Sequence, residues 1–427
     1  MATVKAVRGT RDLLPPETEL WNRIEATARE VFARYNFGEI RTPIFEDTGL
    51  FARSVGEETD IVSKEMYTWE DRARAQSEKA QSLTLRPENT AGVVRAYIEH
   101  KLGETGLLQK LYYIGPQFRR ERPQKGRYRQ FWQIGAEVIG PPSAGSESPL
   151  RDAEILEMLA TFLSELGITG WHLEINSVGS ASDRPRYVAA LREALEPVKH
   201  LMCEDNQRRA ETNPLRVLDS KDPKDQEIMD KLPKIADYLD ESSKAHFAAV
   251  CAALDACGVQ YEVNPRLVRG LDYYTRTTFE FTHGGLGAQN ALLGGGRYDG
   301  LSEAIGGPKA PGIGFAMGED RLILTLEAQA GQEMRLADAY IAPMGEALNP
   351  VALELARDLR RNGLRVELGD GSFRLKKSFE MGNKLARKIV LFGEDEQQSG
   401  ILTVKDFASG EQVKVPKTEL AQELAKR

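Results

Sequence analysis

The sequence has 427 residues, of which 41% are hydrophobic and 28% are charged, a composition typical of a globular protein and not of a disordered chain. At roughly 150 residues per domain, this length predicts two or three domains. The net charge of −7 disfavours a protein that binds any polyanion without selectivity.

The hydropathy pattern predicts no membrane segment. The longest stretch without a charged side chain, residues 281–296, is shorter than the span of about 20 apolar residues that a membrane helix needs. The first residues contain basic side chains but no apolar segment or cleavage site, so we expect a soluble, cytoplasmic protein with no membrane partner. The spacing of Cys203, Cys251 and Cys257 matches neither a disulfide framework nor a zinc site. We expect buried or inactive thiols, and no metal site built from protein ligands alone.

A helix and a strand are the first predicted elements. Residues 17–35 place apolar side chains near one stripe, which predicts an amphipathic helix. β-Branched residues around Pro43 predict a strand over residues 39–46, and a proline there indicates an edge or an interface bulge. Residues 83–92 predict a strand, a turn and the start of a helix.

An antiparallel hairpin follows. Residues 111–121 and 127–140 predict its two strands, and the turn between them is basic. Residues 152–166 predict a helix that ends before Gly167.

Beyond this helix, the pattern predicts an insertion and a separate C-terminal domain. Residues 178–262 are helix-rich and highly charged, which favours an inserted helical module. Strand patterns return at residues 267–282 and 312–317, on either side of a glycine-rich segment, and a helix follows at 319–329. Later strands and helices alternate, which predicts an α/β domain. We place one domain at residues 1–330, interrupted by the insertion, and a second at 331–427.

Two stretches are strongly basic although the chain is acidic overall. Residues 119–129 contain six basic side chains and one acidic side chain, and residues 357–388 contain ten and four. A single charged stretch commonly reflects a solvent-exposed face. Two of them in different domains favour an extended anionic partner, because neutralisation of phosphates drives nucleic-acid affinity.

The hairpin places polar side chains on shared faces. Arg119 and Glu121 share one side of the first predicted strand, because side chains alternate along a strand. On the return strand Gln133, Gly135 and Glu137 share a face, so two polar side chains flank a residue without one. This pattern fits a binding slot, and it also fits an ordinary solvent-facing side of the hairpin.

Other charged residues occupy positions that suggest ligand binding. Arg86 and Glu88 flank a proline that fixes the turn and orients both charges. Arg321 lies in the first turn of its predicted helix, where the macrodipole disfavours a cation, and this suggests an anionic ligand. Arg269 could bind a ligand or could form a plain ion pair with Asp272.

Together these segments resemble the histidyl-tRNA synthetase family of class II aminoacyl-tRNA synthetases, in the family's order and over essentially the whole chain. The segments are EIRTPIFE (39–46), TLRPEN (84–89), FRRERPQKGRYRQFWQIGAE (118–137), LVRGLDYY (267–274), GGGRYDGL (294–301) and GIGFAMGEDRL (312–322). The first segment, the hairpin and the last segment are similar to class II motifs 1, 2 and 3, and LVRGLDYY and GGGRYDGL to the histidine-specific pair. The resemblance implies an α+β catalytic domain on an antiparallel sheet with a helical insertion, followed by a C-terminal α/β domain of the anticodon-binding type.

The resemblance also implies an activity and a set of site residues. ATP with Mg²⁺ and L-histidine would form histidyl-adenylate, and the histidine would then pass to tRNA(His) on a homodimeric enzyme. The implied histidine-binding residues are Glu88, Thr90, Arg119, Gln133, Glu137, Arg269, Tyr273 and Tyr274, and the implied ATP-binding residues are Arg119, Glu121 and Arg321. Arg119 and Arg269 are the implied catalytic residues, and Arg122, Gln124, Lys125 and Arg127 the implied contacts to the tRNA acceptor end.

Two alternatives compete with this interpretation. One is a regulatory subunit of ATP phosphoribosyltransferase that keeps the fold without charging tRNA, but such paralogues lose part of the histidine-specific pair and the C-terminal domain. The other is a nucleic-acid-binding protein without catalysis, which leaves the slot at Gln133 and Glu137 unexplained.

Overall fold

The computed structural model describes residues 3–56, 59, 61–71, 80–124, 126–220, 222–271, 273–286, 290–330 and 337–426. The chain divides into two compact units, Met1–Gln332 and Glu333–Arg427. The predicted domain boundary, between residues 330 and 331, adjoins residues 331–336, which lie outside the described part of the chain. No helix among the described residues is long and apolar enough to cross a membrane.

The first unit is built on an eight-stranded sheet with the order β1-β5-β6-β11-β10-β9-β7-β8. Neighbouring strands are antiparallel except at the two edges, where β1 pairs with β5 and β7 with β8 in parallel. The strands are β1 (Gly38–Glu39), β5 (Gln109–Phe118), β6 (Gln130–Ile139), β7 (Trp171–Ser177), β8 (Glu262–Val263), β9 (Thr275–His283), β10 (Ala291–Arg297) and β11 (Gly312–Gly318). This sheet confirms the predicted fold class of the catalytic domain.

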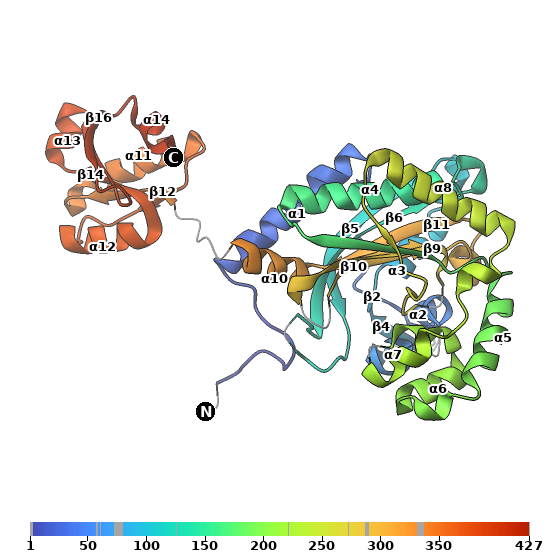
Figure 1. Cartoon of the computed structure of the whole chain (residues 1–427). Helices are drawn as coiled ribbons and strands as arrows, with labels where there is room; N and C mark the ends of the chain where they lie inside the picture. The colour runs from blue at the N-terminus through green and yellow to red at the C-terminus, as the bar shows by residue number, and fades with distance from the viewer. Residues whose placement is uncertain are drawn as a thin grey trace. The chain divides into compact units, whose positions relative to one another are not determined.

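Long helices cover one face of this sheet (Figure 1). They are α1 (Glu17–Arg34), α4 (Pro149–Leu166) and α8 (Glu241–Cys257), and with α10 (Glu319–Ala330) they share one hydrophobic core with the strands. α1 confirms the helix predicted at residues 17–35, and its buried stripe contains Trp21, Ile24, Ala28 and Val31 as expected. α4 ends at Leu166, and the capping residue Gly167 has a φ of +81°, the left-handed conformation that glycine adopts at little cost.

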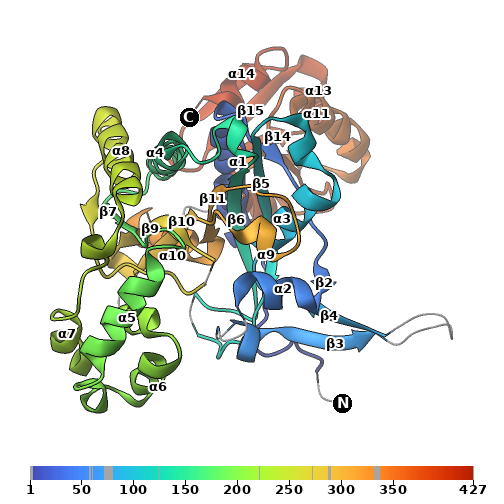
Figure 2. The same ribbon diagram turned by 90° about the vertical axis from the view of Figure 1, so that its right-hand side faces the viewer.

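A three-stranded antiparallel sheet, β2-β4-β3, lies beside α2 in this unit (Figure 2). Its elements are β2 (Phe45–Asp47), β3 (Tyr67–Asp71), β4 (Gln81–Leu85) and α2 (Thr48–Val55), and α3 (Thr90–Glu99) and α9 (Leu301–Ala304) complete this region. The single strand predicted over residues 39–46 is wrong, because only its ends belong to strands. Arg86 donates hydrogen bonds to the carbonyl oxygens of Thr42 and Pro43 at 2.9 and 3.3 Å, and Pro43 has no N–H to donate to a ladder.

The helical insertion has a core of its own. α5 (Arg184–Leu195), α6 (Glu204–Thr212) and α7 (Pro223–Met229) contribute to a separate cluster that includes Tyr187 and Leu191. In contrast, Val250 and Leu254 of α8 pack in the core of the main sheet, so α8 differs from the rest of the predicted segment 178–262.

Short 3₁₀- and π-helices also occur among the described residues. They are η1 (Ile61–Glu65, a π-helix), η2 (Leu102–Thr105), η3 (Pro142–Ala144), η4 (Lys199–Leu201), η5 (Pro214–Asp219), η6 (Ile235–Tyr238), η7 (Gly284–Leu286) and η8 (Glu346–Leu348).

Two strand predictions near the C-terminal end of this unit need correction. The pattern at residues 267–282 forms a strand only from Thr275 onward, so the described residues of 267–274 form a loop. In the glycine-rich segment that follows, for which no strand was predicted, residues 291–297 form the central strand β10. A Cβ on Gly295 would lie 2.1 Å from the carbonyl oxygen of Gly314, so the close approach of β10 and β11 requires glycine there.

The second unit is an α/β domain on a five-stranded sheet with the order β13-β12-β14-β15-β16. β12 pairs in parallel with β13 and β14, and the other pairs are antiparallel. Its strands are β12 (Ala337–Pro343), β13 (Val366–Leu368), β14 (Ala386–Phe392), β15 (Ile401–Asp406) and β16 (Gln412–Pro416), and its helices α11 (Asn349–Arg361), α12 (Leu375–Leu385), α13 (Glu394–Ser399) and α14 (Leu420–Ala425). The predicted alternation of strands and helices is confirmed.

Candidate active site

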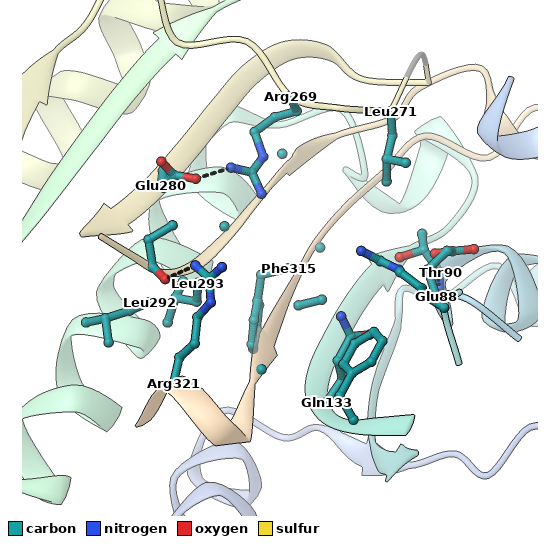
Figure 3. Close-up of a pocket in the computed structure, with 18 of the residues that line it drawn as sticks. Glu88, Thr90, Gln133, Arg269, Leu271, Glu280, Leu292, Leu293, Phe315 and Arg321 are labelled. Carbon is teal, nitrogen blue, oxygen red and sulfur yellow. Dashed lines mark hydrogen bonds and ion pairs between the residues drawn. The ribbon is translucent and has the colours of Figure 1, made fainter. Parts of the chain in front are cut away.

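One cavity of about 250 Å³ opens in the first unit over the middle of the large sheet. β6, β10 and β11, the first turns of α3 and α10, and the loops before β6 and β9 contribute its lining (Figure 3). It brings together every residue implied for histidine and ATP: Glu88, Thr90, Arg119, Glu121, Gln133, Glu137, Arg269, Tyr273, Tyr274 and Arg321. In the view of Figure 3, Arg269 and Arg321 lie on one side and Glu88 and Thr90 on the other.

The carboxylate wall of this pocket consists of Glu88, Thr90 and Glu137. Glu137 on β6 has no exposed surface, and it accepts hydrogen bonds of 2.7 Å from the hydroxyls of Thr90 and Tyr298. Burial raises the pKa of Glu137 to about 8, although these two hydrogen bonds oppose the shift. A cationic or N–H-donating ligand would lower this pKa and favour the ionised form of the carboxyl.

Glu88 also lies in the carboxylate wall, at the start of α3. Its carboxylate accepts the backbone N–H groups of Thr90 and Ala91 at 2.7 and 2.9 Å. The side chain of Asn89, the residue before this helix, makes no capping hydrogen bond and instead accepts one from Thr42. Burial raises the pKa of Glu88, and the two N–H groups oppose the shift. The helix terminus thus fixes the direction in which this carboxylate faces the pocket.

Gln133 and Arg119 lie next to the carboxylate wall. The side-chain oxygen of Gln133 is buried and has no hydrogen-bond partner among the described residues, which leaves it available to a ligand N–H. Arg119 donates from Nε to the carbonyl oxygen of Pro87 at 2.9 Å, and its guanidinium lies 5.2 Å from the centre of the Phe131 ring. The prediction that Arg119 and Glu121 belong to the first hairpin strand is wrong, because β5 ends at Phe118 and both residues lie in the loop.

The arginine wall consists of Arg269 and Arg321. Arg269 comes from the loop before β9, and its guanidinium pairs with Glu280 at 2.5 Å. The alternative partner, Asp272, lies outside the described residues. Arg321 lies in the first turn of α10, as predicted, and donates to the carbonyl oxygen of Ala291 at 2.5 Å. The two guanidiniums thus place positive charge opposite the carboxylates.

The loop between β5 and β6 carries the residues implied for the tRNA acceptor end. Arg122 and Gln124 are exposed, whereas Arg127 lines the pocket and pairs with Glu121 at 3.3 Å. Lys125 lies outside the described part of the chain. Arg127 therefore lies with the pocket residues and apart from Arg122 and Gln124.

Glycines in β10 and β11 leave space for the charged side chains. A Cβ on Gly294 would lie 2.5 Å from the Arg269 guanidinium, and one on Gly314 would lie 1.7 Å from the Glu137 carboxylate. Both glycines line the pocket. The glycine-rich strand, which overlaps the segment GGGRYDGL, is therefore part of the site, although no role was predicted for its glycines.

Tyr298 is a pocket residue that sequence reasoning missed. It follows the fully buried Arg297, which pairs with the buried Asp152 of α4 and so fixes the end of β10. Tyr298 donates to Glu137, and its ring centre lies 6.0 Å from that of Tyr273. Its position in GGGRYDGL was the available signal, but no role follows from the motif alone.

The described residues contain no group of three His, Cys, Asp or Glu side chains that could hold a metal ion. Two of the thiols are partly buried, and Cys203 donates to Asp225 at 3.2 Å. Cys257 is exposed, so of the two expected states, buried or inactive, burial does not apply to it.

Comparisons with known proteins agree with this arrangement. The Histidyl-tRNA synthetase family model matches residues 9–322, and the Anticodon binding domain model matches residues 338–427. A histidine–tRNA ligase from Koribacter versatilis (strain Ellin345) is 71% identical over 98% of this chain and 95% of that protein, and one from Solibacter usitatus (strain Ellin6076) is 57% identical over 99% of both. The crystal structure of apo S. aureus histidyl-tRNA synthetase is 38% identical, with a TM-score of 0.78 over 99% of this chain and 100% of that one. The chain belongs to the histidyl-tRNA synthetase family.

Proposed function

We propose that this protein ligates L-histidine to the 3′ end of tRNA(His) in two steps that consume ATP. The observation that carries the proposal is one pocket in which buried carboxylates lie opposite guanidiniums. Histidine presents an ammonium and imidazole N–H groups, and its carboxylate must meet the α-phosphate of ATP. A pocket of this polarity can bind both partners and bring their reacting groups together.

The carboxylate wall is proposed to bind histidine. Glu88, Thr90 and Gln133 would hold the α-amino group, because a carboxylate, a hydroxyl and an amide oxygen all accept its N–H donors. Glu137 and Tyr274 would bind the imidazole. One ring nitrogen carries a hydrogen and needs a hydrogen-bond acceptor, and the other needs a donor or, when it is also protonated, a second acceptor. Tyr273 would line the ring pocket.

Residues of the loop and of the arginine wall are proposed to bind ATP. Arg119 would bind the α-phosphate, Glu121 would face the adenine, and Arg321 would stack on the adenine or hold the terminal phosphate. Guanidiniums suit this role because they donate two parallel hydrogen bonds to phosphate oxygens. ATP would enter as its magnesium complex, since Mg²⁺ is commonly held by substrate phosphates and only one or two carboxylates. Glu121 is a carboxylate of the pocket with the right chemistry for such a contact.

The proposed first step joins the two substrates. A carboxylate oxygen of histidine attacks the α-phosphorus, the bond to the β-phosphate oxygen breaks, and pyrophosphate leaves with the electron pair. Arg119 and Arg269 would neutralise the charge that collects between the carboxylate and the α-phosphate. In the second step, the 3′-hydroxyl of the tRNA attacks the histidyl carbonyl and releases AMP.

Contacts to tRNA are proposed for both units. Arg122, Gln124, Lys125 and Arg127 would contact the acceptor end near the pocket. We propose residues 1–330 as the catalytic domain and residues 331–427 as the anticodon-binding domain. The basic helix α12 of the second unit, with its exposed Lys376 and Lys377, would supply part of the phosphate contacts. Because the activity serves protein synthesis, we place it in the cytoplasm.

We further propose a homodimer formed through the segment around Pro43. Ile44 and Phe45 are 45% and 52% exposed, and Trp69 packs its ring against Phe45 at 6.1 Å while remaining partly exposed itself. Exposed apolar side chains in one region favour self-association about a two-fold axis. Sedimentation at micromolar concentration should give the mass of two chains, and a monomer there contradicts this proposal.

Histidine-dependent exchange of labelled pyrophosphate into ATP tests the proposed activity. An aminoacylating enzyme should show exchange that requires histidine, and it should also transfer histidine to tRNA(His). A regulatory phosphoribosyltransferase subunit or a passive nucleic-acid-binding protein should show no exchange. The retained Arg269 and the C-terminal α/β unit favour the first outcome over the regulatory alternative.

A further inference from the structure

The loop between β5 and β6 contributes charged residues to the pocket. This loop lies beyond the hydrogen-bonded pairing of the two strands. β5 ends at Phe118 and β6 begins at Gln130. Arg119, Glu121 and Arg127 all lie between these residues and all line the pocket. Contacts from outside the hairpin therefore supplement the hydrogen bonds within the loop, such as the pair between Gln124 and Arg127.

The segment before α1 supplies backbone contacts to this loop (Figure 1). The carbonyl oxygen of Gly9 accepts the Arg129 N–H at 2.7 Å, and the Arg129 carbonyl oxygen accepts the Arg119 N–H at 2.9 Å. The guanidinium of Arg129 also donates to the carbonyl oxygen of Arg8 at 3.2 Å. Two successive backbone hydrogen bonds thus connect the N-terminal segment to the backbone of Arg119.

Gly9 fits tightly against the loop. Its φ is +89°, in the region that side chains with a Cβ rarely adopt. A Cβ at this position would lie 2.8 Å from Pro123 and 2.9 Å from the side chain of Arg129. The close contact therefore needs glycine for two separate reasons.

Arg11 makes a second connection, through its side chain. It donates to Glu17 at 2.6 Å and to Asp320 at 2.7 Å, and its guanidinium lies 4.6 Å from the centre of the Tyr128 ring. Asp320 and Tyr128 both line the pocket, and Asp320 precedes Arg321. One guanidinium therefore joins α1, the first turn of α10 and the loop, with partly buried partners that strengthen the contacts.

We propose that residues 8–11 form an N-terminal strap that positions the loop between β5 and β6 for ATP, with Arg11 as its positioning residue. This inference rests on the proposed function, and it assigns a task in that reaction to a segment outside the three class II motifs. The contacts that define the strap reach the loop, α1 and α10, and the carboxylate wall takes part in none of them. Loss of the strap should therefore weaken the use of ATP and leave the binding of histidine nearly unchanged.

Pyrophosphate exchange by the full-length protein tests the strap through Arg11→Met and Gly9→Ala. Each variant should raise the KM for ATP about tenfold, because small displacements of positioning groups are costly, and should keep the KM for histidine within about twofold. Arg34→Met is the matched control, since Arg34 also forms an ion pair of α1, with Glu165, but lies in the last turn of that helix. It should leave both constants within about twofold.

Two outcomes would contradict the proposed role of the strap. In one, both variants keep a wild-type KM for ATP, so that Arg11 and Gly9 only stabilise the fold. In the other, the two KM values rise together and the melting temperature falls, which indicates general damage. If one variant fails to fold, the other decides. If the wild-type chain shows no exchange, the proposed function fails, and the same variants then test the strap through the Kd of ATP measured by calorimetry.

Discussion

The two walls of the pocket differ in how the protein holds them. The carboxylate wall is almost fully buried, and its acidic groups accept hydrogen bonds from a helix N-terminus, a threonine and a tyrosine. The arginine wall comes from a loop and a helix start, where Arg269 pairs with a carboxylate and Arg321 donates to a backbone carbonyl oxygen. The difference suggests a division of tasks. Buried acceptors suit discrimination between amino acids, whereas guanidiniums held in place by partners can stabilise charge that develops during reaction.

The largest effect should come from Arg269→Ala in the arginine wall. Charge collects between the histidine carboxylate and the α-phosphate only as they meet, so this guanidinium should stabilise the transition state more than either bound substrate. Loss of one preorganised charged donor costs about 3–4 kcal/mol, or roughly a hundred- to thousandfold in single-turnover adenylate formation. Lysine should rescue poorly, because an ammonium lacks the planar fork of donors with which a guanidinium bridges two oxyanions.

Glu280→Gln is the control for this prediction, because Glu280 is the ion-pair partner of Arg269. If the pair were only structural, Glu280→Gln would be as harmful as Arg269→Ala, and both would lower the melting temperature. Near-normal activation by Arg269→Ala would refute its catalytic role.

A smaller effect, of a different kind, should follow from Glu137→Gln in the carboxylate wall. The amide keeps the shape but cannot accept on both sides, so it conflicts with the donors Thr90 and Tyr298 as well as with a ligand N–H. Hydrogen bonds to charged groups contribute about 1.5–3 kcal/mol, which predicts a KM for histidine roughly ten- to a hundredfold higher. The KM for ATP should change little. Steady-state exchange kinetics measure both, and an equal rise in both constants would contradict the division between the walls.

Two glycine substitutions should separate the walls with the same chemical change. Gly294→Ala places a methyl group against the Arg269 guanidinium, and Gly314→Ala places one against the Glu137 carboxylate. Because misplaced groups lose much of their effect, we expect the first to lower kcat and the second to raise the KM for histidine, each by about tenfold. Gly38→Ala is the control, since a Cβ on Gly38 would meet nothing within 4 Å. If both variants change the same constant, the walls do not act separately.

These glycines also show why some parts of the fold could be predicted from the sequence and others could not. α1 and α4 were predictable because each buries a long apolar stripe with a period of 3.6 residues. β10 was not predictable from its own sequence, because glycine weakens strands. The groups that require glycine at these positions lie on other elements. Gly294 accommodates a side chain from residue 269, and Gly295 accommodates a backbone oxygen of β11.

The site, like β10, depends on contacts between segments that are distant in the sequence. The implied residues for histidine and ATP do meet in one pocket, but neither Tyr298 nor the hydrogen-bonded position of Glu88 followed from local patterns. The contact of Tyr298 joins segments far apart in the chain, because it reaches Glu137 across 161 positions of sequence. Spacing within one segment contains no information about such pairs.

The smallest predicted effect concerns the pH dependence of stability in the carboxylate wall. Burial raises the pKa of Glu137 to about 8 in the folded protein, against about 4.3 for an unperturbed glutamate. Between these values the folded state holds the proton more tightly than the unfolded state, so the contribution of this group to stability falls as the pH rises through that range. Glu137→Gln removes this dependence.

The difference in melting temperature between the ligand-free variant and the wild type should therefore shift by about 2–4 °C in favour of the variant between pH 6 and pH 8.5. Histidine should reduce this difference, because a bound N–H donor or cation favours the ionised carboxylate in the wild type. Calorimetric melts at the two pH values, with and without histidine, measure it, and parallel curves for the two proteins would show that Glu137 does not titrate in this range.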